Sequence, residues 1–178
     1  MRKPSKALLA RIKKIRLAIL DVDGVLTDGR LYYGANGEEL KVFNTQDGHG
    51  IKMLAESGIT VAIISGRSSK ALRKRAADLG VVHLMMGVGD KAQAYQKLLK
   101  KLQLPTDVVA SIGDDVVDLP ILLHCGFSVA VPDAPEAVTS RVDFVTSRAG
   151  GAGAVREFCD VIMHAQGTDQ LALERYLG

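Results

Sequence analysis

The sequence predicts an α/β fold in which a parallel, Rossmann-like sheet is covered by helices on both faces. Short apolar runs recur along the chain with helical patterns between them, the alternation typical of such sheets. The runs are continuously apolar, as expected for strands buried on both faces. The chain has 178 residues and 47% hydrophobic content. It is therefore predicted to form one compact domain over residues 1–178, with right-handed crossovers between strands.

The elements follow one another in a regular order. A short amphipathic helix is expected near residues 5–14, and the first strand follows it at "LAILDV". Further strands are expected at "TVAIIS", "VHLMM", "VVASIGD" and "FSVAV", with a weaker sixth at "DFVT". Helices are expected at "GHGIKMLAESG", "SSKALRKRAADLG", "DKAQAYQKLLKKLQLP" and "DVVDLPILLHCG". Each carries apolar residues at helical spacing, and most of them end at glycine or proline. A last helix is expected after the glycines of "SRAGGAGAVRE".

Residues 29–44 depart from this alternation. The strand-like pieces "RLYYG" and "EELKVF" flank Asn36-Gly37, a dipeptide typical of tight hairpin turns. The segment therefore predicts a β-hairpin that projects after the first strand. An isolated two-stranded hairpin is marginally stable in water. We therefore expect Tyr32 and Tyr33 to pack on a partner subunit, with the base of the hairpin itself as the alternative.

Composition argues against several classes of protein. The net charge is only +3, aromatic content is 4%, and the chain has no tryptophan, so the sequence does not favour nucleic-acid binding. Cys125 and Cys159 lie in separate apolar stretches, which predicts core cysteines in a reducing compartment. The basic N-terminus lacks the long apolar centre of a signal peptide, and no run reaches the roughly 18 apolar residues of a membrane span. A cytoplasmic protein without a membrane partner is the expectation.

Polar side chains gather where the predicted strands end. Ligands of open α/β sheets bind beyond the carboxyl ends of the strands. Each of these residues has an ordinary alternative role as a helix cap or a solvated side chain. Together, however, so many carboxylates at one edge would repel one another unless a cation lay among them. The residues are Asp21, Asp23, Ser65, Lys91, Asp114, Asp115 and Asp118.

The expected cation is Mg²⁺. Carboxylate oxygens suit this hard ion, and Mg²⁺ commonly shares phosphate oxygens in phosphoryl-transfer sites. A zinc site is disfavoured because the histidines are scattered without ligand spacing, at His49, His83, His124 and His164.

The motifs "DVDGVLTD", "IISGR", "DK" and "GDDVVDLP", in this order, resemble the four motifs of the haloacid dehalogenase superfamily of aspartyl phosphotransferases. The resemblance is strongest to the small 3-deoxy-D-manno-octulosonate 8-phosphate phosphatases. It extends to "NGEELKVFNTQDGHGIKML" and to "GGAGAVREFCDVI". It implies a magnesium-dependent phosphatase that releases phosphate from this eight-carbon sugar acid, in the cytoplasmic pathway toward lipopolysaccharide of Gram-negative bacteria.

The resemblance also implies roles for individual residues. Asp21 would be the nucleophile that becomes the aspartyl phosphate, and Asp23 would act as general acid and then as general base. The backbone carbonyl of Asp23 would join the side chains of Asp21 and Asp114 on Mg²⁺. Ser65 would hydrogen-bond the phosphoryl group and Lys91 would offset its charge.

Further roles are implied around this centre. Asp115 and Asp118 would orient the metal shell. The intervals before and after Ser65 hold only a hairpin with a helix and a helix with a strand, which leaves no cap domain. Arg67, next to Gly66, is expected to bind the substrate carboxylate, since a guanidinium matches that geometry. Sugar hydroxyls are expected to meet Asn44, Asp47 and His49, with a solvated loop role as the alternative for His49.

An open site needs something else to exclude water, and the resemblance implies a homotetramer in which hairpins pack together. The tail at 167–178 would reach an adjoining site, or would be a frayed helix end. Three alternatives stay open: a phosphatase for the nine-carbon 2-keto-3-deoxynonulosonate 9-phosphate, a non-catalytic module of the same fold, and a phosphomutase. The missing cap argues against the third. The second is disfavoured by the intact residues Asp21, Asp23, Lys91 and Asp114.

Overall fold

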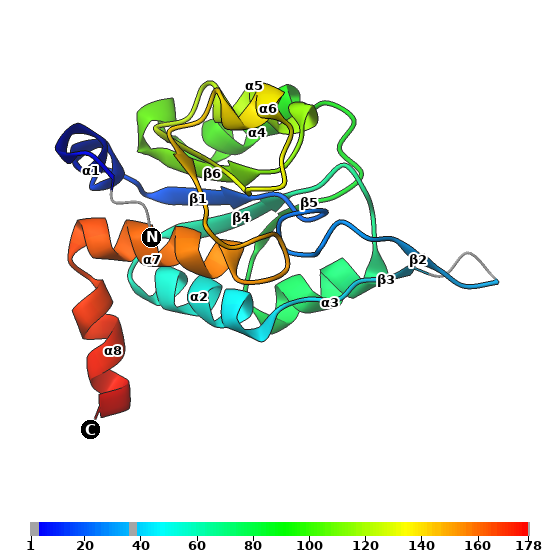
Figure 1. Ribbon diagram of the computed structural model, residues 1–178, viewed down its shortest axis with the longest axis horizontal. Helices are drawn as coiled ribbons and strands as arrows, with labels where there is room; N and C mark the ends of the chain where they lie inside the picture. The colour runs from blue at the N-terminus through cyan, green and yellow to red at the C-terminus, as the bar shows by residue number, and fades with distance from the viewer. Residues whose placement is uncertain (1–3, 36–38, 178) are drawn as a thin grey trace.

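The computed structural model describes residues 4–35 and 39–177. Six parallel strands form one sheet in the order β5-β4-β1-β6-β7-β8 (Figure 1). The six expected strands are all confirmed: β1 (Leu17–Leu20), β4 (Thr60–Ile64), β5 (His83–Met85), β6 (Val109–Gly113), β7 (Phe127–Ala130) and β8 (Phe144–Val145).

Polar side chains begin most of the longer helices between these strands. Ser5, Asn44, Ser69 and Asp90 each accept a hydrogen bond from a backbone N–H of the first turn, as expected for helix N-caps. The α-helices are α1 (Lys6–Ile12), α2 (Thr45–Glu56), α3 (Lys70–Asp78), α4 (Lys91–Leu102), α5 (Leu119–Leu122), α6 (Glu136–Thr139), α7 (Ala154–Gln166) and α8 (Asp169–Leu177).

One expected helix, at "DVVDLPILLHCG", is much shorter in the structure. The segment forms the 3₁₀ turn η2 (Val116–Asp118) and then the four-residue α5, with Pro120 in the first turn of α5. Proline lacks the N–H that would continue a longer helix through this point. The 3₁₀ turn η1 (Thr106–Val108) and the short α6 were not anticipated from the sequence.

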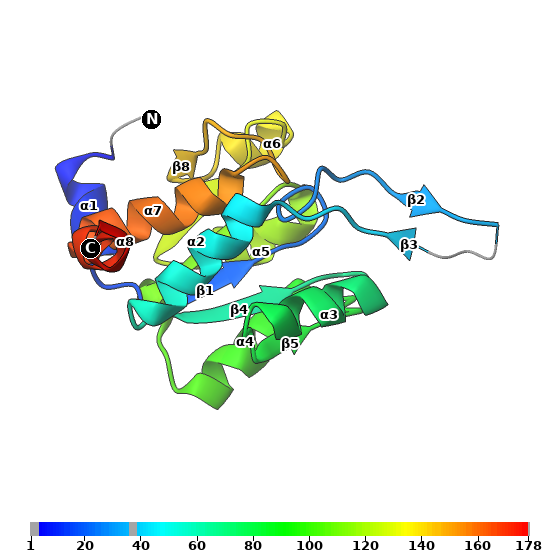
Figure 2. The same ribbon diagram turned by 90° about the horizontal axis from the view of Figure 1, so that it is seen from below.

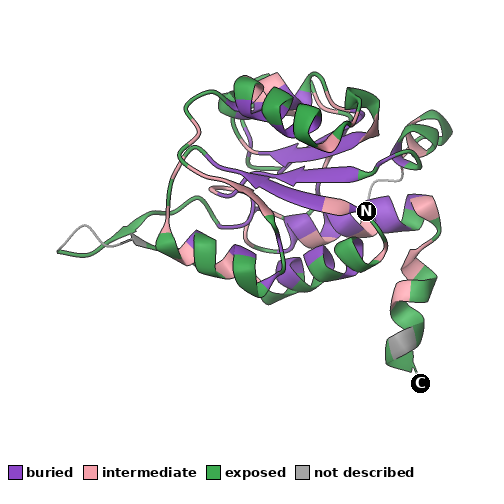
Figure 3. Cartoon of the chain, turned by 180° about the vertical axis from the view of Figure 1, so that it is seen from behind, coloured by how far each residue is buried: buried purple, intermediate pink, exposed green. Residues whose placement is uncertain are grey.

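Helices cover the sheet on both faces. Helices α2, α3 and α7 lie on one face and α4 and α5 on the other, while the strands between them are buried (Figures 1 and 3). Helix α2 packs along α7. A Cβ atom on Gly50 would lie 2.8 Å from Cδ of Arg156, so this close approach requires glycine. The sheet and its two helical layers confirm the predicted fold class.

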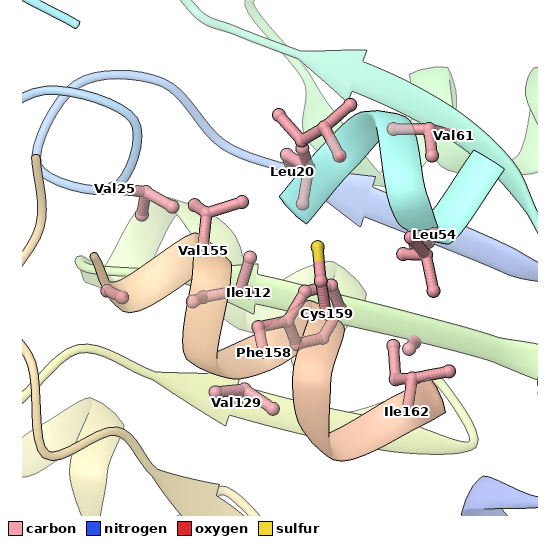
Figure 4. Close-up of a cluster of buried hydrophobic side chains, with 14 of the residues drawn as sticks. Leu20, Val25, Leu54, Val61, Ile112, Val129, Val155, Phe158, Cys159 and Ile162 are labelled. Atoms are coloured by element: carbon pink, nitrogen blue, oxygen red, sulfur yellow. The ribbon is translucent and has the colours of Figure 1, made fainter. Parts of the chain in front are cut away.

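The core around α7 contains one of the two cysteines. Figure 4 shows Cys159 among the apolar side chains of Phe158, Leu20 and Leu54. Both cysteines are free, and Cys125 is partly buried. Burial raises the pKa of the Cys159 thiol well above its ordinary value and that of Cys125 to about 12. They are core residues, as expected.

A hairpin projects beyond the carboxyl end of β1 (Figure 2). Its strands β2 (Tyr32–Tyr33) and β3 (Glu39–Leu40) pair antiparallel. The predicted Asn36-Gly37 turn lies outside the described residues. Helix α8 extends from the end of α7, away from the sheet (Figures 1 and 3). Within the described ranges, no helix has both the length and the apolar character needed to cross a bilayer.

Candidate active site

The predicted site lies where the strand order reverses. After β1 the chain builds outward through β4 and β5, and it then returns to the other side of β1 with β6, β7 and β8. Strands β4 and β6 are both neighbours of β1, so their carboxyl ends meet at this switch point. A cavity of about 620 Å³ opens there, lined by Asp21, Asp23, Lys91, Asp114 and Asp115 among others.

The nucleophile candidate Asp21 is held by a buried lysine. Lys91 begins α4, and its Nζ donates to Oδ1 of Asp21 at 2.6 Å and to Oδ1 of Asp118 at 2.5 Å. All three side chains are buried. The other oxygen of Asp118, Oδ2, accepts from the backbone N–H groups of Asp114 and Asp115. Asp118 therefore joins Lys91 to the loop after β6, a more direct structural role than the one expected from sequence.

Asp114 lies against the turn that follows β1. A Cβ atom on Gly24 would come within 2.0 Å of Oδ2 of Asp114, and Gly24 has a φ of +84°. Only glycine meets both conditions without strain. The turn at Gly24 thus lets the carboxylate of Asp114 approach the backbone next to Asp23. Asp115, by contrast, is exposed and caps η2 through its contact with Val116 N–H.

The carboxylates disturb one another's protonation. Burial, together with the charge of Asp118, raises the pKa of Asp21 to about 6 despite the adjacent Lys91. Burial and the charges of Asp21, Asp118 and Asp115 raise the pKa of Asp114 to about 7. Burial alone would lower the pKa of Lys91, but Asp21 and Asp118 outweigh it and raise that pKa. One lysine therefore leaves part of the negative charge at this edge uncompensated.

These residues fit a divalent cation. Asp21, Asp114 and Asp118 each offer a carboxylate oxygen, and the three oxygens lie within 4.8 Å of one another. An all-oxygen donor set suits Mg²⁺, and a cation among the carboxylates would relieve the repulsion that raises their pKa values. Within the described ranges, no cluster of histidine and cysteine forms a comparable site.

The loop after β4 also lines the cavity. Gly66 and Arg67, which are predicted to bind substrate, are among the lining residues. Ser65 is buried at the end of β4, and its Oγ accepts from the N–H of Arg67 at 3.2 Å. Since this bond uses Ser65 Oγ as an acceptor, its hydroxyl proton is available to donate to a phosphoryl oxygen. Nη2 of Arg67 donates to the hydroxyl of Tyr33 at 3.0 Å.

The structure does not bring three predicted substrate contacts into the cavity. Asp47 is only 1% exposed, and its Oδ1 accepts from the N–H of Arg156 in α7 at 2.7 Å. Asn44 caps α2 through its side-chain oxygen and donates to the carbonyl of Gly151 at 3.3 Å. His49 packs edge-on against Tyr176 of α8, with 5.6 Å between ring centroids. These side chains join α2 to α7, to the loop before α7 and to α8, and their contact with sugar hydroxyls stays a prediction.

Sequence reasoning missed one residue of the site. Nζ of Lys41, directly after β3, forms an ion pair with Oδ1 of Asp23. Its local sequence looks like an ordinary hairpin strand with a solvated lysine. It lies in the stretch "NGEELKVFNTQDGHGIKML" that carries the resemblance, but its spacing gives it no role, because the contact depends on how the hairpin folds back over the end of β1.

A parallel sheet carries a buried Asp-Lys-Asp cluster at its switch point, and the family model of the haloacid dehalogenase-like hydrolases matches residues 81–158. The 3-deoxy-D-manno-octulosonate 8-phosphate phosphatase of Salmonella typhi is 50% identical over 163 residues, which is 92% of this chain and 87% of that protein. The phosphatase structure from Yersinia pestis has a TM-score of 0.91 at 48% identity, covering 93% of this chain and 89% of that one.

A third relative was solved with ligands. The phosphatase of the same name from Moraxella catarrhalis, in complex with magnesium, phosphate and KDO, has a TM-score of 0.93 at 40% identity and covers 96% of this chain and 98% of that one. The chain therefore belongs to the family of the 3-deoxy-D-manno-octulosonate 8-phosphate phosphatases.

Proposed function

We propose that this protein hydrolyses 3-deoxy-D-manno-octulosonate 8-phosphate to the free sugar acid and phosphate through an aspartyl-phosphate intermediate. The observation that carries the proposal is the buried Asp21, held by Lys91 at 2.6 Å on the wall of an open cavity with Asp23 beside it. The named function of half-identical relatives supports the choice of substrate.

Two displacements at phosphorus make up the reaction. Asp21 attacks phosphorus, and Asp23 gives a proton to the departing sugar oxygen. Asp23 then takes a proton from the water that attacks the aspartyl phosphate, which returns Asp21 to its carboxylate form. Lys91 places its charge beside the nucleophile, and the hydroxyl of Ser65 would donate to a phosphoryl oxygen. Positioning and electrostatics of this kind supply most of the catalysis in phosphoryl transfer.

Mg²⁺ would be held by the side chains of Asp21 and Asp114 and the backbone carbonyl of Asp23, with Asp118 and Asp115 supporting these ligands. When bound, it supplies positive charge to the phosphoryl oxygens and keeps Asp21 ionised. The carboxylate cluster and the close packing of Asp114 on Gly24 support this assignment.

Arg67 and Gly66 are proposed to bind the substrate. They line the same cavity as Asp114 and Asp115, and a guanidinium there suits the carboxylate of the sugar acid. The exposed hairpin side chains Leu31, Tyr32 and Leu40 support assembly into a homotetramer that covers the site. A cytoplasmic location, a role in lipopolysaccharide precursor synthesis and a single domain over residues 1–178 belong to the same proposal.

A substrate panel tests the function. Phosphate release would be compared for the eight-carbon and nine-carbon ketoacid phosphates and for simple hexose phosphates, with and without EDTA. We expect preference for the eight-carbon substrate, dependence on Mg²⁺, and loss of turnover in Asp21→Asn. Activity that persists in EDTA or in Asp21→Asn would refute the mechanism. A preference for the nine-carbon compound would refute the substrate alone, and sedimentation of a fully active monomer would refute the tetramer.

A further inference from the structure

In the segment that returns from the hairpin, the apolar side chains are exposed and the lysine side chain is buried. Leu40 and Val42 are 70% and 62% exposed, whereas the side chain of Lys41 between them is 2% exposed. In a hairpin on a soluble protein, the apolar residues normally face inward and the lysine faces water. The direction in which Lys41 points therefore needs an explanation.

Lys41 points into the molecule, where its ammonium meets a carboxylate. Its ammonium pairs with Oδ1 of Asp23, whose side chain is 23% exposed and lines the cavity. The other basic group of the carboxylate cluster, Lys91, contacts Asp21 and Asp118. The two aspartates of "DVDGVLTD" thus have different partners, since Asp21 pairs with Lys91 and Asp23 pairs with Lys41.

The side chain of Lys41 is buried where it meets Asp23. Placing a lysine ammonium out of water is costly unless a carboxylate accepts its hydrogen bonds. Lys41 lies at the base of the hairpin. Its ion pair with Asp23 therefore restricts the rotamers that Asp23 can adopt. A solvated aspartate at a turn would sample several rotamers.

We propose that Lys41 is a positioning residue for Asp23, through which the hairpin holds the general acid at its working place in the cavity. This inference rests on the proposed function, in which Asp23 protonates the departing sugar oxygen. Lys41 acts through Asp23 and takes no part in the bond changes itself.

A second contact from the hairpin agrees with this role. The hydroxyl of Tyr33 on β2 accepts from Arg67, which lines the cavity. Each strand of the hairpin thus leads to a residue that touches a cavity side chain, and the element reaches the site from within the same chain.

Leaving-group chemistry separates positioning of the acid from general damage. An alkoxide needs a proton as it leaves, whereas p-nitrophenolate leaves without one. The experiment compares the full-length protein with Lys41→Met and with the control Lys74→Met, an exposed lysine of α3 far from any assigned role. It measures kcat and KM for the eight-carbon sugar phosphate, and the pre-steady-state burst of p-nitrophenolate from p-nitrophenyl phosphate. Lys41→Gln replaces Lys41→Met if the latter fails to fold.

In Lys41→Met we expect kcat for the sugar phosphate to fall about 10- to 100-fold, with KM changed less than about 3-fold. The p-nitrophenolate burst rate should change less than about 3-fold, and Lys74→Met should match the wild type. Equal losses on both substrates, or no loss on the sugar phosphate, would overturn the proposal. If the wild type leaves the sugar phosphate intact, the proposed function fails, and Lys41 is then tested on the best alkyl phosphate of the panel.

Discussion

Removal of the charge on Asp114 gives the sharpest test of the carboxylate cluster. Asp114 sits among Asp21, Asp115 and Asp118, and burial with these charges raises its pKa to about 7. Replacement by asparagine keeps the shape of the side chain and removes the repulsion. We therefore expect Asp114→Asn, in EDTA at pH 8, to be more stable than the wild type.

The magnitude follows from the pKa of Asp114. Its rise from 3.8 to about 7 corresponds to at most about 4 kcal/mol. Because the side chain is only partly buried, solvent screening reduces this to about 1–2 kcal/mol. The folded protein holds a proton that the unfolded chain releases near pH 4. The free energy of unfolding of the metal-free wild type therefore falls as pH rises from about 4 to about 7, and this fall is smaller in Asp114→Asn.

Thermal unfolding in EDTA from pH 5 to pH 8, repeated with Mg²⁺, measures these effects. A gain of 1–2 kcal/mol corresponds to about 2–8 °C in Tm for a chain of this size. Magnesium at about 100 times its dissociation constant should add about 2.7 kcal/mol to the wild type and little to the variant. Asp133→Asn, on an exposed loop, is the control. The reasoning fails if Asp114→Asn is the less stable protein in EDTA, or if it gains as much from Mg²⁺ as the wild type.

Three further substitutions test other parts of the site. Gly24→Ala would force a Cβ atom against Asp114, so we expect weaker Mg²⁺ binding by calorimetry and at least about 100-fold lower kcat; near-normal values would contradict the packing. Lys91→Met leaves Asp21 without its buried cation and should lower the free energy of unfolding in urea by about 3 kcal/mol at pH 8. The loss should be smaller at pH 5, where the Asp21 carboxylate holds a proton. Equal losses at both pH values would argue against the ion pair. Arg67→Lys should raise KM for the eight-carbon ketoacid phosphate about 10-fold while KM for p-nitrophenyl phosphate stays constant; parallel changes would show that Arg67 does not bind the carboxylate.

The parts of the site on the sheet edge were predictable from sequence because topology places them. Once β1, β4 and β6 are recognised as parallel strands, their carboxyl ends must share an edge, and the residues after them must converge. The structure accordingly brings together Asp21, Asp114 and Lys91, which are far apart in the chain. Short elements were less predictable, since the 3₁₀ turn η2 and Pro120 in the first turn of α5 interrupt the start of a longer helical pattern.

Residues in "FNTQDGHG" lie away from the cavity, although their sequence predicts contacts with sugar hydroxyls. A polar run after a hairpin resembles a substrate loop, but it forms the start of α2, where Asn44 caps the helix and Asp47 faces the N-terminus of α7. Whether a polar side chain at a helix start faces ligand or a neighbouring helix depends on which helix packs beside it. That packing is a tertiary property, and a single sequence carries no signal for it.

The position of Lys41 joins two parts of the proposal that the sequence leaves separate. The hairpin strand that presents Leu40 and Val42 to the outside presents the ammonium of Lys41 to Asp23. Lys41 lies between Leu40 and Val42 and is buried where they are exposed, so packing of the apolar pair on another copy of the chain would also hold Lys41 in place. Assembly and acid placement would then share one element. In such an arrangement Lys41 reaches Asp23 from within its own chain, while Leu40 and Val42 would meet the neighbouring subunit of the proposed tetramer.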